Sequence, residues 1–127
     1  MSKILIVEDD QFISRLYQHL FTLEGYEIEA VGDGEAALKR ITAGGLDLVL
    51  LDIMLPKMNG LDVLRRLRET PPAIPNGPVV LLTNLGQDSV IKEGFKLGAK
   101  GYMIKSALEP KQLVAEVKTY LAKKQGS

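Results

Sequence analysis

Residues 47–52 of the chain read Asp47-Leu48-Val49-Leu50-Leu51-Asp52, an apolar run that ends at a carboxylate. Two other stretches share this design, namely Lys3-Ile4-Leu5-Ile6-Val7, which ends at Glu8, and Val79-Val80-Leu81-Leu82, which ends at Thr83. Apolar runs without alternation are typical of strands that are covered on both faces, as in a parallel sheet. Weaker strand patterns occur at residues 26–31 and 101–104, so we expect five strands.

Helical patterns separate these strands. The first, at residues 11–24, carries Phe12, Leu16, Leu20 and Leu23 at the spacing of an amphipathic helix. Further helices are expected at residues 33–42, from Asn59 onward, at residues 88–97 and from Glu109 onward. Strands and helices that alternate five times imply an α/β fold, with a parallel sheet, right-handed crossovers and helices on both faces.

Length and composition exclude several classes of function. The 127 residues suit one domain, and the absence of cysteine excludes disulfides and thiolate chemistry. The 16 basic and 16 acidic residues cancel, so we expect no nucleic acid or membrane binding. We expect a soluble cytoplasmic protein with a single domain over residues 1–127, a core over residues 3–122, a flexible tail at 123–127 and no output domain.

Polar side chains follow four of the five expected strands. They are Glu8 and Asp9 after the first, Asp52 at the end of the third, Thr83 after the fourth and Lys105 after the fifth. Ligands of open α/β sheets bind beyond the carboxyl ends of the strands. We therefore expect three carboxylates, a hydroxyl and an ammonium to meet at one edge of the sheet.

Crowded carboxylates repel each other unless a cation lies nearby. Mg²⁺ bound among Glu8, Asp9 and Asp52 would offset this repulsion. This ion prefers oxygen ligands and commonly shares its coordination shell with a phosphate. Lys105 is expected to reach the far side of Asp52. A soft-metal site is not expected, because the chain has no cysteine and its one histidine, His19, is far from this edge.

Asp52 is the candidate nucleophile. Pro56 and Gly60 are expected to make the loop after it rigid, so that its carboxylate and the Met54 carbonyl face the same site. A carboxylate can attack phosphorus to give an aspartyl phosphate. The position two residues after Asp52 holds Met54, which cannot serve as the acid of a phosphatase. The chain is therefore expected to hold a phosphoryl group and to release it slowly.

Together these residues resemble the receiver domain of response regulators in bacterial two-component signalling. The matching residues are Glu8-Asp9, Asp52 with Pro56 and Gly60, Thr83, and Gly101-Tyr102-Met103-Ile104-Lys105. The resemblance covers residues 3–122 and implies a (βα)5 flavodoxin-like three-layer sandwich with strand order 2-1-3-4-5. It implies phosphorelay signalling, in which a sensor histidine kinase, a phosphotransfer protein or a small phosphodonor supplies the phosphoryl group.

The resemblance also implies a role for each residue. Asp52 would be the phosphoacceptor, and Mg²⁺ would be held by Glu8, Asp9, Asp52 and the Met54 carbonyl. Lys105 would contact the phosphoryl group, and Thr83 would move to bond it and draw Tyr102 inward. The surface of the fourth helix, fifth strand and fifth helix would then dock an unknown protein target. Such a chain is a switch that catalyses only its own phosphorylation and slow dephosphorylation, and is not otherwise an enzyme.

Three places are unusual for the family. Asn84 replaces a small residue and would narrow the phosphoryl site, and Ser106 replaces the usual proline, so a cis bond after Lys105 would cost about 2.5–4 kcal/mol. Lys100-Gly101 occupies a place where related dimers use acids, so a monomer is favoured. Met54 and Leu85 flank the site and cannot orient a water molecule.

Two other interpretations remain open. Gly32-Asp33-Gly34-Glu35-Ala36-Ala37 matches a dinucleotide fingerprint, although Asp33 and Glu35 would repel the pyrophosphate. The second alternative is a receiver-like interaction module that works without phosphorylation. Single residues also have structural explanations: Asp10 suits a helix cap, and Tyr102 suits a half-buried strand position.

Overall fold

The computed structural model describes residues 1–84, 88–105 and 109–126, with side chains described up to residue 122. Five parallel strands form one sheet of order β2-β1-β3-β4-β5. They are β1 (Lys3–Val7), β2 (Glu27–Val31), β3 (Leu48–Asp52), β4 (Val79–Thr83) and β5 (Gly101–Ile104). The helices are α1 (Gln11–Leu23), α2 (Gly34–Ala43), α3 (Gly60–Glu69), α4 (Asp88–Lys96) and α5 (Pro110–Gly126).

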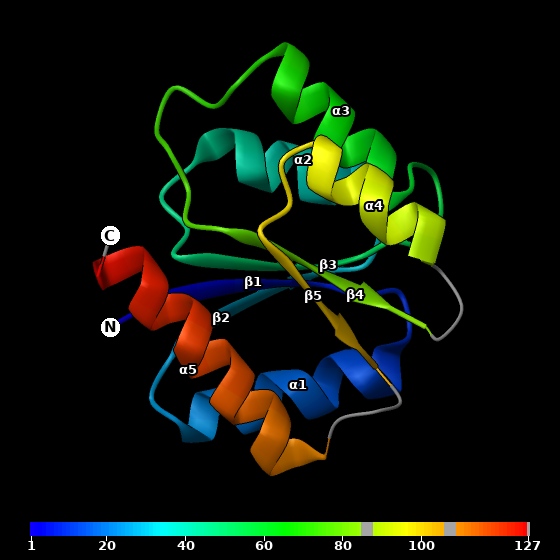
Figure 1. Cartoon of the computed structure of the whole chain (residues 1–127). Coiled ribbons are helices and arrows are strands. Elements are labelled where there is room, and N and C mark those ends of the chain that lie inside the picture. The colour runs from blue at the N-terminus through cyan, green and yellow to red at the C-terminus, as the bar shows by residue number, and fades with distance from the viewer. Residues whose placement is uncertain (85–87, 106–108, 127) are drawn as a thin grey trace.

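The sheet is the middle layer of three (Figure 1). Helices α1 and α5 cover one face, and α2, α3 and α4 cover the other. This confirms the expected (βα)5 flavodoxin-like sandwich and its strand order. The backbone of α5 remains helical to Gly126, beyond residue 122, where we expected the ordered core to end.

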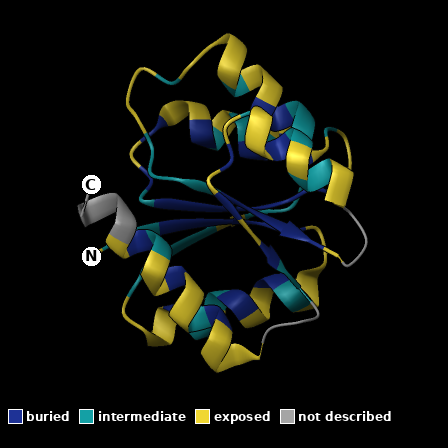
Figure 2. Cartoon of the chain, viewed as in Figure 1, coloured by how far each residue is buried: buried dark blue, intermediate teal, exposed yellow. Residues whose placement is uncertain are grey.

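The core consists of two apolar layers, one on each face of the sheet (Figure 2). Along β1, Ile4 and Ile6 pack toward α1 and α5, whereas Leu5 and Val7 pack toward α2 and α3. Every residue of β3 is buried. Burial on both faces explains why the strand sequences are continuous apolar runs without polar alternation.

The apolar stripe from which we predicted α1 is not the face that α1 buries. Phe12, Leu16 and Leu23 are 78%, 42% and 69% exposed, and Tyr17 and Phe21 enter the core instead. Both sets of residues have helical spacing, so periodicity alone could not choose between them. Tyr17 and Phe21 share the buried side of α1 with Ile13 and Leu20, which pack against the same core, so this side removes more apolar surface from water.

The start of α2 lies directly against the loop between β3 and α3. A Cβ atom on Gly34 would lie 1.7 Å from the backbone oxygen of Met58. The amide of Gly34 bonds the Pro56 carbonyl at 3.4 Å, and the amide of Ala36 bonds the side chain of Asp33 at 2.8 Å. Both amides are therefore bonded within the chain, which gives the dinucleotide interpretation no structural support.

This close contact makes Gly34 a test of the fold. We expect Gly34→Ala to lower the free energy of unfolding by about 2–3 kcal/mol, because the added methyl group must displace loop backbone. Gly32→Ala is the matched control, since its Cβ would meet Glu8 only at 3.9 Å. Urea unfolding followed by circular dichroism measures both changes. Equal stability of the two variants would contradict the packing described.

Candidate functional site

The polar residues that the sequence analysis singled out meet at the carboxyl edge of the sheet. Glu8 follows β1, Asp52 is the last residue of β3, and Lys105 follows β5. They line a hollow of about 500 Å³. The described residues of its lining are Glu8, Asp9, Asp10, Ile13, Asp52, Met54, Asn84 and Lys105.

Three carboxylates form the centre of this site. Glu8, Asp9 and Asp52 each offer one oxygen atom, and these atoms all lie within 4.8 Å of one another. Glu8 and Asp52 are only 1% and 4% exposed, whereas Asp9 is exposed. A set of oxygen donors with one member open to solvent suits Mg²⁺, which takes oxygen ligands and keeps several waters.

Lys105 supplies the counter-charge. Its Nζ atom lies 2.6 Å from Asp52 Oδ2 and 2.6 Å from Glu8 Oε1. The contact with Asp52 was expected, but the contact with Glu8 was not. No sequence signal pairs these two residues, because they lie on different strands that other strands separate.

Burial is the largest influence on Glu8 and raises the pKa of its carboxyl group. The ammonium of Lys105 and the amide of Asp10, which donates to Oε2 at 3.1 Å, lower that pKa, and neighbouring Asp52 raises it. Glu8 Oε1 is close to Lys105 but makes no directional hydrogen bond with a described residue. This buried oxygen therefore retains the capacity to bind a cation.

The same surroundings act on Lys105. Burial lowers the pKa of its ammonium group, but the contacts with Asp52 and Glu8 outweigh burial, so the pKa is raised. Lys105 is consequently a fixed positive charge at any physiological pH. A charge of this kind can also face an incoming anion.

The loop after β3 is held in place by its own backbone. Asp52 Oδ1 accepts a hydrogen bond from the Met54 amide at 3.1 Å, and the Gly60 amide bonds the Ile53 carbonyl at 2.8 Å. A Cβ atom on Gly60 would lie 2.6 Å from the Asp52 carbonyl oxygen, so the turn requires glycine. The side chain of Met54 is 61% exposed at the rim of the hollow.

Asp10 has two roles, of which the sequence indicated one. It is the N-cap of α1, as expected, and accepts from the Ile13 amide at 3.1 Å. It also lines the hollow together with Ile13, which was not predicted from the sequence. Tyr17, one turn further along α1, lies near enough for its pKa to respond to Lys105, Glu8 and Asp52, although burial is the main cause of its raised value.

Thr83 and Tyr102 are the two residues that were expected to act as the switch. Thr83 is 1% exposed, and its hydroxyl donates to the Asn84 carbonyl at 3.2 Å. Tyr102 is 45% exposed and makes an edge-to-face contact with Phe95 of α4, with ring centroids 6.2 Å apart. Asn84 lines the hollow. Leu85 and Ser106, and with Ser106 the geometry of the Lys105–Ser106 peptide bond, lie outside the described residues.

The fold and this acidic edge define the chain as a response regulator receiver domain. The chain belongs to that family, whose model matches residues 4–118. Receiver domains use Mg²⁺, and the carboxylate cluster fits that ion.

Several relatives carry the same domain. The transcriptional regulatory protein CpxR of Escherichia coli K12 is 38% identical over 121 residues, which are 95% of this chain and 50% of that protein. The alkaline phosphatase synthesis transcriptional regulatory protein PhoP of Bacillus subtilis is 36% identical over 119 residues, 94% of this chain and 48% of PhoP. The chain thus spans about half the length of these relatives.

Solved structures agree with this assignment. A CheY-like receiver domain protein from Methanospirillum hungatei JF-1 superposes with a TM-score of 0.86 at 26% identity, covering 99% of this chain and 98% of that one. A putative response regulator from Chloroflexus aurantiacus J-10-fl superposes with a TM-score of 0.80 at 32% identity, covering 95% of this chain and 98% of that one. Among the described residues, none of the helices is long and apolar enough to span a membrane.

The buried carboxyl group of Glu8 predicts a pH effect on stability. Since folding raises its pKa, the folded chain holds this proton more tightly, and the contribution of Glu8 to stability is lost as pH rises through the raised pKa. The free energy of unfolding of Glu8→Gln, relative to the unchanged chain, should therefore increase from about pH 4 to about pH 7.

Urea titrations at several pH values without Mg²⁺ measure this difference. Glu29→Gln is the control with the opposite sign, because the side chain of Arg40 lowers the pKa of Glu29. A relative stability of Glu8→Gln that stays flat or falls with pH would contradict the raised pKa.

Proposed function

We propose that this receiver domain accepts a phosphoryl group on Asp52 in a cytoplasmic phosphorelay. The donor is the phosphohistidine of a sensor kinase or phosphotransfer protein, or a small phosphodonor. An Asp52 carboxylate oxygen attacks phosphorus, and the bond from phosphorus to the leaving group breaks. One observation carries this proposal. Lys105 Nζ lies 2.6 Å from the buried carboxylate of Asp52, which is grouped with the carboxylates of Glu8 and Asp9.

Charge neutralisation is the chemical task of the other residues. The transferring group is anionic, so it approaches three carboxylates only if positive charge offsets the repulsion. Glu8, Asp9, Asp52 and the Met54 carbonyl would hold Mg²⁺, which supplies part of that charge. Lys105 supplies the rest, and it already lies beside the Asp52 oxygen.

A phosphoryl group adds a charge of about −1.5 to −2 and strong acceptors to the site. The Thr83 hydroxyl, now bonded to the Asn84 carbonyl, would turn to a phosphoryl oxygen. Tyr102 would then leave its contact with Phe95 and move inward. The surface of α4, β5 and α5 changes as a result, which is how a local charge becomes a docking signal.

The exposed stripe of α1 suits the approach of a protein donor. Phe12 and Leu16 lie on the same helix as Asp10 and Ile13, which line the hollow. Exposed apolar residues beside a reactive site favour packing against a partner. A protein that covers this stripe brings its phosphohistidine to the rim of the hollow.

Phosphorylation by acetyl phosphate tests the proposal directly. With Mg²⁺, mass spectrometry should show a gain of one phosphoryl group, about 80 Da, which disappears in Asp52→Asn and with EDTA. Lys105→Ala should reduce the rate strongly, because the phosphoryl group loses its fixed counter-charge. An unmodified chain that is folded and binds Mg²⁺ would instead favour an interaction module that works without phosphorylation.

The aspartyl phosphate should also be long-lived. Met54 lies at the rim of the hollow and cannot orient a water molecule, so we expect a half-life well beyond seconds. Met54→Glu should shorten it by about tenfold or more, because a carboxylate there can act as a general base. Loss of the phosphoryl mass after removal of donor measures both rates, with Met54→Leu as control. A half-life of seconds in the unchanged chain would refute the prediction.

A further inference from the structure

The loop between β3 and α3 contains a residue with an unusual backbone conformation. Lys57 has a φ angle of 66°, the only positive φ of a residue other than glycine in the part of the chain that the structure describes. This left-handed region is unfavourable for a residue with a side chain, because Cβ lies too close to the following carbonyl oxygen. Such conformations persist only where surrounding contacts fix them, and they are most frequent at functional sites. The contacts around Lys57 therefore indicate what the loop does.

The tip of this loop lies on the first turn of α2. The Pro56 carbonyl accepts hydrogen bonds from the Met58 amide at 2.7 Å and from the Gly34 amide at 3.4 Å. Lys57 lies between the two loop residues, and its Nζ atom is 3.8 Å from the carboxylate of Asp33. The Met58 backbone approaches Gly34 so closely that it leaves no room for a methyl group there. The loop thus meets α2 through backbone contacts that only glycine permits.

The base of the same loop carries the site. Asp52 Oδ1 accepts from the Met54 amide at 3.1 Å, and the Gly60 amide closes the loop by donating to the Ile53 carbonyl at 2.8 Å. Met54 is only two residues before Pro56, and proline restricts its own backbone and that of the residue before it. Few rotatable bonds therefore separate the Met54 carbonyl from the tip of the loop, so a displacement of the tip is passed on to that carbonyl.

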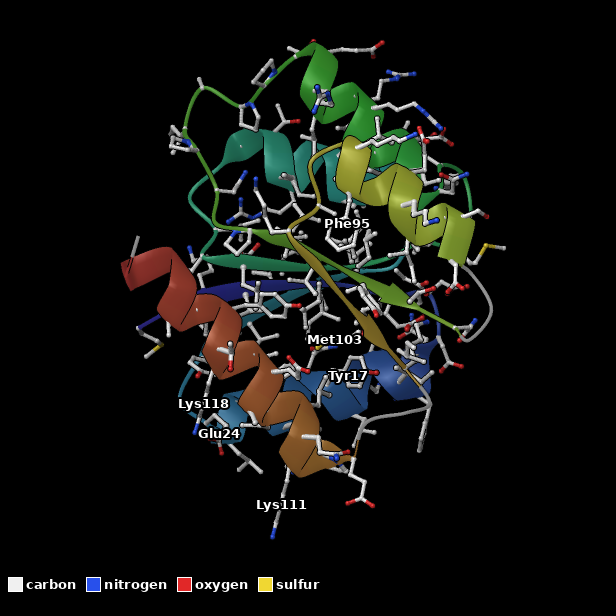
Figure 3. All side chains as sticks on the ribbon, viewed as in Figure 1. Tyr17, Glu24, Phe95, Met103, Lys111 and Lys118 are labelled. Carbon is white, nitrogen blue, oxygen red and sulfur yellow. The ribbon has the colours of Figure 1, made fainter. Side chains whose placement is uncertain are left out.

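The side chains of the loop belong to one core layer. Leu55 and Met58 pack against the layer of α2 and α3. Tyr17 and Met103 lie in the other layer, between the sheet and the helices α1 and α5 (Figure 3). The contact of the loop with α2 is consequently separate from the packing of α1 and α5, and variants in the two layers can be compared.

We propose that the first turn of α2, acting through Lys57, positions the Met54 carbonyl for a bound Mg²⁺ ion. The inference rests on the proposed function, in which this carbonyl is one of the metal ligands. Mg²⁺ demands near-ideal octahedral geometry at short distances, so a displaced carbonyl binds it less well. Asp33, Gly34 and Lys57 are then positioning residues, although none of the three is among the described residues that line the hollow.

This role also accounts for a sequence pattern that the site itself does not use. Gly32-Asp33-Gly34 matches the start of a dinucleotide fingerprint. Asp33 Oδ1 caps α2 by accepting from the Ala36 amide at 2.8 Å, and its Oδ2 atom faces Lys57. Gly34 makes room for the loop. Asp33 and Gly34 therefore both serve the contact between α2 and the loop.

A purely structural contact is the competing explanation, and the effect of Mg²⁺ on unfolding separates the two. The gain in the free energy of unfolding on addition of Mg²⁺ depends on its Kd, and the stability of the chain without Mg²⁺ does not enter this gain. Gly34→Ala should raise the Kd by about tenfold, because the added methyl group displaces the Met58 backbone. With Mg²⁺ well above both Kd values, a tenfold change lowers the gain by about 1.4 kcal/mol. Urea unfolding at several Mg²⁺ concentrations measures it.

Two controls accompany this variant. Gly32→Ala adds the same methyl group to the same turn, where it would meet the Glu8 carbonyl only at 3.9 Å. Leu121→Ala removes a buried side chain of the other core layer and so lowers stability away from the loop. Both should leave the Kd of Mg²⁺ within about twofold of that of the unchanged chain.

Substitutions of Lys57 test the left-handed conformation at constant charge. Lys57→Gly, Lys57→Asn and Lys57→Ala all remove the same ammonium group, but glycine and asparagine adopt a positive φ more readily than alanine. The Kd of Mg²⁺ should be about threefold higher for Lys57→Ala than for Lys57→Gly, with Lys57→Asn between them. Lys57→Pro, whose φ is fixed near about −65°, should bind about tenfold more weakly than Lys57→Ala.

The outcomes distinguish this inference from the proposed function. An unchanged Kd in Gly34→Ala, equal Kd values across the Lys57 variants, or an equal rise in Leu121→Ala would each overturn the positioning role while Mg²⁺ binding itself stands. If calorimetric titration and unfolding both show that the unchanged chain binds no Mg²⁺, the metal part of the proposed function fails, and the positioning role fails with it.

Discussion

The contact of one half-buried ammonium with two buried carboxylates is the constraint on which the site depends. Glu8, Asp9 and Asp52 hold oxygens within 4.8 Å of one another, an arrangement that repulsion and burial both oppose. Lys105, at 2.6 Å from two of them, offsets that cost in the folded chain. Removing one partner of such a buried cluster costs far more than an exposed ion pair contributes, because it leaves a charge uncompensated.

The rest of the molecule keeps these charges in place. The burial of β1 and β3 on both faces fixes where Glu8 and Asp52 emerge. Gly34 packs directly against the backbone of Met58, and Gly60 packs against the Asp52 carbonyl. These contacts hold α2 and the loop after β3 at the same edge of the sheet, so the backbone around Asp52 has little freedom. Rigid charges need no reorganisation when an anion arrives, which is the physical advantage that the proposed phosphoryl site would gain from its place on strand ends. Thr83 and Tyr102, the proposed switch residues, make their described contacts with Asn84 and Phe95 and not with the carboxylates.

The fold and most residues of the site could be predicted from the sequence, whereas several side-chain contacts between them could not. Continuous apolar runs and the helical patterns between them placed the elements within about a residue of their bounds in the structure. Helical periodicity could not choose between the stripe of Phe12 and that of Tyr17 on α1, because both have the same spacing. Ile13 lines the hollow because α1 turns the side that carries Tyr17 and Phe21 toward the sheet.

By itself, the sequence determined that strands alternate with helices and that three acids, a threonine and a lysine end up at one edge, because hydrophobic period and chain order are local properties. Only the tertiary structure decided that Lys105 bridges Glu8 and Asp52 and that burial, more than neighbouring charge, governs the pKa of Glu8. It also decided that Phe95 and Tyr102 share one exposed face. Each of these depends on distances between separate strands and helices, which packing sets and no spacing along the chain encodes.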